Sequence, residues 1–197
     1  MIYRSMYTAF FADKNITDKK NPNVKVMTLS FYENRVFLYM ETTVCDLPPE
    51  DAVEGSFLPL PDGSLWQRMA DVFHYSYPQS EAHWKRTEPI RALDVRINFL
   101  KPDMVGSYVF YHHQFQEECP GGNGGDKYGI IFLLGNMIVM HLEPPYRKDE
   151  TPGVGKLHTN NTPHDTWQSL MNSHFVGWDD SDEYWKNIEC RVLCDNE

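Results

Sequence analysis

The chain has 197 residues, of which 41% are hydrophobic and 14% aromatic. This is enough apolar material to build a core, and it excludes an intrinsically disordered protein. The 18 lysines and arginines face 28 aspartates and glutamates, so the net charge of −10 repels phosphate backbones and anionic lipids. We therefore expect neither nucleic acid nor a membrane surface as a partner.

The sequence also lacks the features of membrane and secreted proteins. No apolar run approaches the roughly 20 residues that span a bilayer, and the N-terminal stretch alternates like a strand instead of resembling a signal peptide. Without a CxxC pair, the four cysteines are expected to be thiols and not a disulfide framework: Cys45, Cys119, Cys190 and Cys194. These observations predict a cytoplasmic protein.

The first half begins with an alternating, aromatic-rich stretch, 2–10, which predicts a strand. Two apolar runs, 24–31 and 36–41, flank a short polar link and predict a hairpin. A loop rich in proline and acidic residues follows at 46–63. The next segment, 65–74 (LWQRMADVFH), has helical spacing and predicts a helix.

The second half repeats this order. Residues 95–100 predict a strand, and residues 128–134 and 138–143 predict a hairpin. A long loop rich in proline and glycine, 148–164, precedes a predicted helix at 167–175. The two halves therefore share a strand, a hairpin, a loop and a helix in the same sequence.

The second half also contains a segment, 102–118 (PDMVGSYVFYHHQFQEE), that predicts a helix of its own. Proline and aspartate in the first turn are a start signal for a helix. Four residues in this segment are spaced three or four positions apart and therefore form one stripe along the helix: Val105, Tyr108, His112 and Phe115. An imidazole on this inner face is either a hydrogen-bonded core residue or a functional group.

The repeated order reflects an internal duplication. Asn34 and Asn136 are 102 positions apart (136 − 34), and Trp84 and Trp185 are 101 positions apart (185 − 84). Trp66 and Trp167 share the second of these offsets, and matched tryptophans are unlikely to arise by chance. We therefore divide the chain into a degenerate repeat, 1–93, and a complete repeat, 94–197.

These elements predict an α+β fold of two tandem ferredoxin-like β-α-β-β-α units, packed as an intrachain dimeric α/β barrel. Roughly 12 residues are missing from the first half where the second half has its helix 102–118, so the first unit is expected to lack its first helix. A helix needed only for packing would be needed in both copies, so its survival in one copy suggests a functional role. Fusion of the units removes the need for a partner chain, and further homo-oligomerisation stays open.

The second half resembles the L-rhamnose mutarotase family of small dimeric α/β-barrel proteins. The resemblance rests on Tyr108-x-x-x-His112, on Tyr128 at the head of the hairpin, and on Trp167 followed by Met171. It implies that His112 is the proton donor and that Tyr108, Tyr128 and Trp167 contact a sugar. The family's Trp-Trp doublet is a single tryptophan in this chain.

Mutarotation moves a proton from the anomeric hydroxyl to the ring oxygen, and it requires no cofactor and no metal. Histidine is the side chain best matched to proton exchange near neutral pH. Tyr108 lies one turn from His112 and can orient a hydroxyl, while Trp167 offers a flat apolar surface to a sugar ring. The predicted function is therefore the interconversion of the anomers of a small sugar, and 6-deoxy sugars are among the candidates.

A second acid or base is expected from His141 or Glu143, which share one face of the last hairpin strand. Glu41 repeats Glu143 in the first copy, where no histidine accompanies it, so the pattern favours a structural role for Glu143. In the first copy, Tyr39 replaces His141. The sequence does not show which face of the strand is turned toward the helix.

Three other interpretations remain. His113 and Glu117 are one turn apart and could bind a metal, but adjacent histidines on a helix point about 100° apart. The protein could also be a carbohydrate-binding or regulatory module without turnover. Finally, it could be a cofactor-free or haem-dependent oxygenase, because that chemistry also occurs on dimeric α/β barrels.

Overall fold

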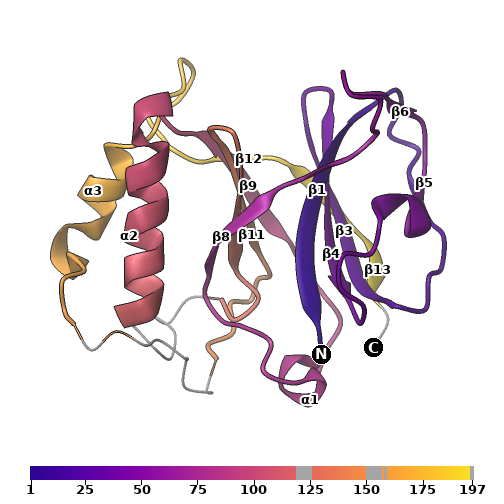
Figure 1. Ribbon diagram of the computed structural model, residues 1–197, viewed down its shortest axis with the longest axis horizontal. Helices are drawn as coiled ribbons and strands as arrows, with labels where there is room; N and C mark the ends of the chain where they lie inside the picture. The colour runs from indigo at the N-terminus through magenta and orange to yellow at the C-terminus, as the bar shows by residue number, and fades with distance from the viewer. Residues whose placement is uncertain (119–125, 150–156, 158, 196–197) are drawn as a thin grey trace. The chain divides into compact units, whose positions relative to one another are not determined.

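The fold is α+β and consists of two units, each built on its own antiparallel sheet (Figure 1). The structure is a computed structural model that describes residues 1–118, 126–149, 157 and 159–195. Unit 1 contains Met1–Met69, Pro78–Leu93 and Ile188–Glu197, and unit 2 contains Ala70–Tyr77 and Asp94–Asn187. None of the helices among the described residues is long and apolar enough to cross a membrane.

The sheet of unit 1 has the strand order β13-β3-β4-β1-β6, and β7 also pairs with β1. Its strands are β1 (Tyr3–Phe11), β3 (Val24–Tyr32), β4 (Arg35–Thr42), β6 (Phe57–Leu58), β7 (Gln67–Arg68) and β13 (Glu189–Asp195). A small separate ladder joins β2 (Thr17–Asp18) to β5 (Val53–Glu54). The predicted strand and hairpin of the first half are therefore confirmed as β1, β3 and β4.

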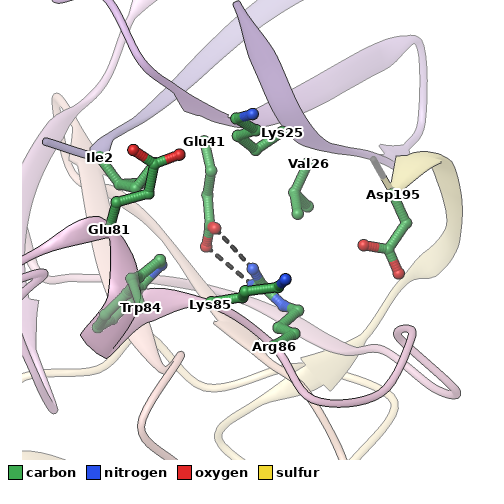
Figure 2. A pocket seen from close by; sticks show the side chains of 9 residues that line it. All are labelled: Ile2, Lys25, Val26, Glu41, Glu81, Trp84, Lys85, Arg86 and Asp195. Atoms are coloured by element: carbon green, nitrogen blue, oxygen red, sulfur yellow. Dashed lines mark hydrogen bonds and ion pairs between the residues drawn. The ribbon is translucent and has the colours of Figure 1, made fainter. Parts of the chain in front are cut away.

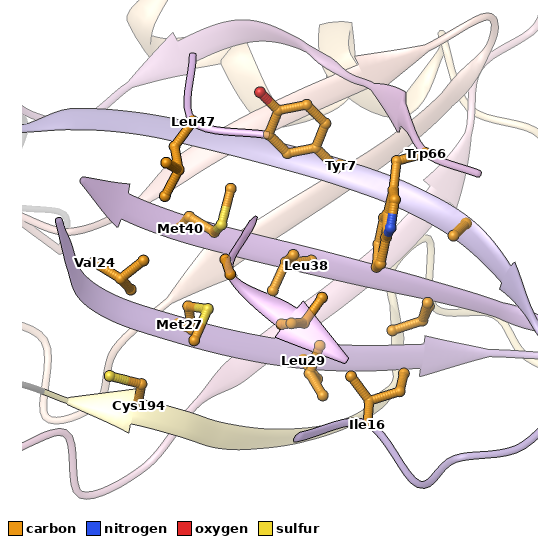
Figure 3. Close-up of a cluster of buried hydrophobic side chains, with 14 of the residues drawn as sticks. Tyr7, Ile16, Val24, Met27, Leu29, Leu38, Met40, Leu47, Trp66 and Cys194 are labelled. Atoms are coloured by element: carbon orange, nitrogen blue, oxygen red, sulfur yellow. The ribbon is translucent and has the colours of Figure 1, made fainter. Parts of the chain in front are cut away.

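One face of this sheet carries a hydrophobic core, shown in Figure 3. Alternating residues of the hairpin, including Met27, Leu29 and Leu38, are fully buried. The layer that covers them comes from the loop between β4 and β7, through Leu47 and Trp66, and contains the 3-10 turn η1 (Pro49–Asp51). The proline-rich loop thus takes the place that a helix occupies in unit 2.

The sheet of unit 2 has the strand order β12-β9-β11-β10-β8. Its strands are β8 (Ala70–His74), β9 (Asp94–Phe99), β10 (Ile130–Leu134), β11 (Met137–Leu142) and β12 (Lys186–Asn187). Helices α2 (Val105–Glu118) and α3 (Trp167–Asn172) lie side by side on one face of this sheet (Figure 1). Each of these helices directly follows a 3-10 turn, α2 after η2 (Pro102–Met104) and α3 after η3 (His164–Thr166). The remaining short helix, α1 (Glu81–Trp84), belongs to unit 1.

The helix predicted at 102–118 is confirmed as η2 and α2, and the helix predicted at 167–175 is confirmed as α3, which ends at Asn172. The helix predicted at 65–74 is wrong, because this segment forms β7 and β8. β8 pairs with β10 and buries Val72 and Phe73 in the core of unit 2. The open edge of β10 offers backbone hydrogen bonds that outweigh the helical spacing of a short segment.

The two hairpins agree in register. β3 ends at Tyr32 and β4 begins at Arg35. In the second hairpin, β10 ends at Leu134 and β11 begins at Met137, so each boundary lies 102 positions later (134 − 32 and 137 − 35). The first turn residue has a positive φ in both hairpins, 53° at Glu33 and 61° at the corresponding glycine. The hairpin part of the predicted duplication therefore has matching geometry in the two units.

The sequence placed one domain boundary between residues 93 and 94. The chain passes between the units there, and it also passes between them after Met69, Tyr77 and Asn187. As a result β8 completes the sheet of unit 2 and β13 completes the sheet of unit 1. Each of these edge strands pairs with the first strand of a hairpin, and each ladder contains a register shift.

Candidate functional site

The helix α2 presents two buried side chains, Tyr108 and His112, to the sheet of unit 2. They are four residues apart and therefore lie one above the other on the same face of the helix. Val105 and Phe115 pack against the same core, so the stripe predicted from the sequence faces the sheet. Pro102 in the preceding turn lacks the N–H that a first helical turn would leave unpaired.

His112 lies among aromatic rings. Its ring centroid is 4.1 Å from that of Tyr108, 5.2 Å from that of Trp167 and 5.3 Å from that of Phe73. Trp167 belongs to α3 and also stacks on Phe115 at 4.7 Å. The structure thus brings together three of the residues predicted for the site, from two different helices.

The hydrogen bonding of His112 fixes its tautomer. Nδ1 donates to the carbonyl oxygen of Tyr108 at 2.9 Å, which leaves Nε2 with a lone pair when the ring is neutral. Burial lowers the pKa of His112 to about 4, although the same hydrogen bond acts in the opposite direction. His112 is therefore a neutral imidazole at pH 7, with Nε2 as a proton acceptor.

Two phenols accompany this imidazole. Burial raises the pKa of Tyr108 above its ordinary value, and the nearby phenol of Tyr75 raises it further. Burial also raises the pKa of Tyr75, with a further contribution from the charge of Asp126. Neither hydroxyl has a hydrogen-bond partner among the residues that the structure describes. Both phenols are therefore neutral at pH 7 and keep a hydroxyl proton that they can donate.

Sequence reasoning missed Tyr75, because it follows a segment that was interpreted as a helix. Its ring packs so closely on Gly129 that a Cβ there would lie 2.5 Å from Tyr75 Cδ2. The backbone N–H of Tyr75 donates to the carbonyl oxygen of Gly129 at 3.1 Å, which continues the β8–β10 ladder. Gly129 directly precedes β10 and lies within the strand predicted at 128–134, where a glycine often marks such a close approach, and this was the available signal.

His174 is a second residue that the sequence did not assign to this site. Its ring is buried and joins α3 to α2, through contacts of 2.8 Å from Nδ1 to Leu170 O and 2.9 Å from Nε2 to Ser107 Oγ. Its centroid lies 6.0 Å from that of Tyr108. His174 therefore forms a bridge that fixes α3 beside α2.

The remaining predicted residues form a separate group. His141 and Glu143 are buried, and His141 Nε2 lies 3.5 Å from Glu143 Oε1. His141 on β11 and Glu143, which directly follows this strand, alternate with Ile138, Met140 and Leu142, which pack in the core beneath α2. His141 and Glu143 therefore lie on the opposite face of the sheet from His112.

Tyr128 belongs to this second group through Asp126. One oxygen of Asp126 accepts the backbone N–H of Glu143 at 2.5 Å, and the other accepts that of Tyr128 at 3.4 Å. Burial raises the pKa of Asp126, while these backbone hydrogen bonds act in the opposite direction. Asp126 was not selected from the sequence, since nothing in the local pattern marks it.

No metal site accompanies these groups within the described residues, where no cluster of three or more His, Cys, Asp or Glu side chains could hold an ion. No disulfide joins the cysteines that the structure describes, and Cys119 lies outside them. Comparison of the chain with protein-family models, curated proteins and solved structures finds no match.

Proposed function

We propose that unit 2 binds a small sugar against α2 and interconverts its anomers without a cofactor, as the resemblance to the L-rhamnose mutarotase family implies. The observation that supports this most directly is the geometry of His112. The hydrogen bond from Nδ1 to Tyr108 O leaves Nε2 as an acceptor beside the rings of Tyr108 and Trp167. Three of the residues that the resemblance selects therefore meet in one place.

In the proposed reaction, Nε2 of His112 takes the proton of the anomeric hydroxyl while the bond from the anomeric carbon to the ring oxygen breaks. The ring oxygen then receives this proton from the imidazolium. One nitrogen can serve both oxygens because they are bonded to the same carbon. Rotation of the free aldehyde and the reverse transfers give the other anomer, with no net change in protons.

The surrounding groups would hold the sugar during these steps. The neutral hydroxyls of Tyr108 and Tyr75 can donate hydrogen bonds to sugar oxygens, and Trp167 can cover an apolar ring face. The low pKa of His112 keeps Nε2 unprotonated at pH 7 and makes its protonated form a strong acid. Return of the proton to the ring oxygen is therefore favourable once the ring has opened.

A second candidate is a sugar-binding module without turnover. The observation that favours it is the same pKa of about 4, because a base this weak removes a hydroxyl proton slowly. His141 and Glu143 do not offset this, since they lie on the other face of the sheet. The two candidates differ only in whether anomers exchange after binding.

Exchange NMR of sugar anomers separates the candidates. With L-rhamnose and a panel of other monosaccharides, the wild type should accelerate anomer exchange of at least one sugar, and His112→Ala should abolish the gain. His113→Ala is the matched control, since His113 is exposed on the same helix, and it should keep the wild-type rate. Binding with unchanged exchange across the panel would favour the module and contradict catalysis.

We also propose that both units are ferredoxin-like repeats. In unit 2 the order β12-β9-β11-β10 corresponds to strands 4-1-3-2 of a β-α-β-β-α-β unit, with α2 and α3 as its two helices. In unit 1 the order β6-β1-β4-β3 corresponds to it, with a loop in place of the helices. Packing of the two units as one α/β barrel is what the family resemblance implies, and it stays a prediction.

A further inference from the structure

Unit 1 contains a cavity of about 280 Å³ whose floor is a buried ion pair (Figure 2). Glu41 on β4 pairs with Arg86 through two hydrogen bonds, 2.6 Å from Nη1 to Oε2 and 2.9 Å from Nη2 to Oε1. Tyr39 donates to Glu41 Oε1 at 2.6 Å and accepts from Arg4 Nε at 2.8 Å. This network spans three segments of unit 1 and fixes the floor in one arrangement.

The floor itself is a poor ligand site. Burial opposes the ionisation of Glu41, but the charges of Arg86 and Arg4 hold its pKa well below the usual range. The carboxylate is therefore ionised at any physiological pH, and it already accepts hydrogen bonds from Arg86 and Tyr39. A ligand that entered would meet groups of the wall before it met this pair.

The wall carries separated charges of both signs. Lys25 and Lys85 line the cavity, and neither ammonium has an ion-pair or hydrogen-bond partner in the part of the chain that the structure describes. Glu81 and Asp195 line it too, and Asp195 uses one oxygen to accept the backbone N–H of Ile90 at 2.7 Å. The two ammonium groups are therefore positive charges at the cavity wall that a bound anion could pair with.

The remaining lining is apolar, from Ile2, Val26 and Trp84, and Figure 2 shows Ile2 and Trp84 on the same side as Glu81. The Trp84 ring is held in place by the Arg4 guanidinium, whose carbon lies 4.9 Å from its centroid. The volume is near the lower limit for small-molecule sites. The cavity therefore suits a small metabolite with one anionic end, several hydroxyls and some apolar surface.

We propose that this cavity binds a small hydroxy-carboxylate, such as a sugar acid. The ligand's carboxylate lies between the ammonium groups of Lys25 and Lys85, and its hydroxyls donate to the carboxylates of Glu81 and Asp195. A carboxylate fits better than a phosphate, because the second negative charge of a phosphate would face those two acids. The site belongs to unit 1, whereas His112 belongs to unit 2.

Isothermal titration calorimetry of the full chain with D-glucuronate tests this assignment. The wild type should bind D-glucuronate at least about tenfold more tightly than D-glucose, which has the same ring without the carboxylate. The double variant Lys25→Met/Lys85→Met should lose at least about tenfold in affinity. Lys148→Met is the control, because Lys148 is an exposed lysine of unit 2, and it should bind as the wild type does.

Several results would overturn the proposal. These are absence of D-glucuronate binding, equal affinity for D-glucose, and an unchanged affinity in the double variant. Binding of inorganic phosphate as tight as that of D-glucuronate would also contradict the proposal, because the site would then select its ligand by charge alone. His112→Ala should leave D-glucuronate binding intact, so a loss of sugar exchange in that variant does not bear on this cavity. Circular dichroism of the double variant confirms that it is folded.

Discussion

Lowering the pH from 7 to 4 should destabilise the protein through His112. The imidazole has a pKa of about 4 in the folded protein against a reference value of 6.5, so between these values the unfolded chain binds a proton that the folded protein does not. Stability from this group is therefore fully present above pH 6.5 and is lost as the pH falls toward 4. The difference of about 2.5 pKa units corresponds to about 3 kcal/mol.

Urea unfolding followed by tryptophan fluorescence measures this effect by comparison with His112→Leu. Both proteins lose stability in acid through their carboxylates, but the free energy of unfolding of the variant should rise by about 3 kcal/mol relative to the wild type between pH 7 and 4. His113→Leu, at an exposed position of the same helix, should parallel the wild type. A constant gap between wild type and His112→Leu would refute a buried neutral imidazole.

Three further results are expected. Glu41→Gln leaves the buried Arg86 without its counter-charge and should lower the free energy of unfolding by about 3 kcal/mol or more, and unchanged urea unfolding would contradict this. Gly129→Ala places a Cβ 2.5 Å from Tyr75 and should cost about 1–3 kcal/mol; thermal unfolding at the wild-type temperature would argue against that contact. Sugar exchange, if His112 is the base, should be constant from pH 7 to 5 and half lost near pH 4, whereas a midpoint near 6.5 would exclude the buried ring.

The parts of the fold that the sequence predicted are those with a strong local period. The stripe from Val105 to Phe115 follows the period of a helix, and in the structure this face of α2 packs against the core of unit 2. The hairpins were predicted because short polar links separate alternating apolar runs, and their register agrees at an offset of 102 residues (134 − 32). The same period predicted that Tyr108 and His112 lie on one face of the helix, and both are buried in the structure.

The parts that the sequence did not predict depend on distant segments. β8 forms because β10 has an edge to complete, and nothing within 65–74 encodes that edge. Arg86 lies 45 positions from Glu41, and this pair could not be anticipated from either segment. Likewise, the sequence grouped His141 and Glu143 with His112, but the alternation of β11 places them behind the sheet.

The reciprocal positions of β8 and β13 have a consequence for any attempt to dissect this protein. A gene cut after residue 93 would give an N-terminal fragment without β13 and a C-terminal fragment without β8, so that β3 and β10 would each present a bare edge. Such edges recruit other chains and promote aggregation. Neither fragment should be soluble on its own, while co-expression of both should restore a complementary, non-covalent pair.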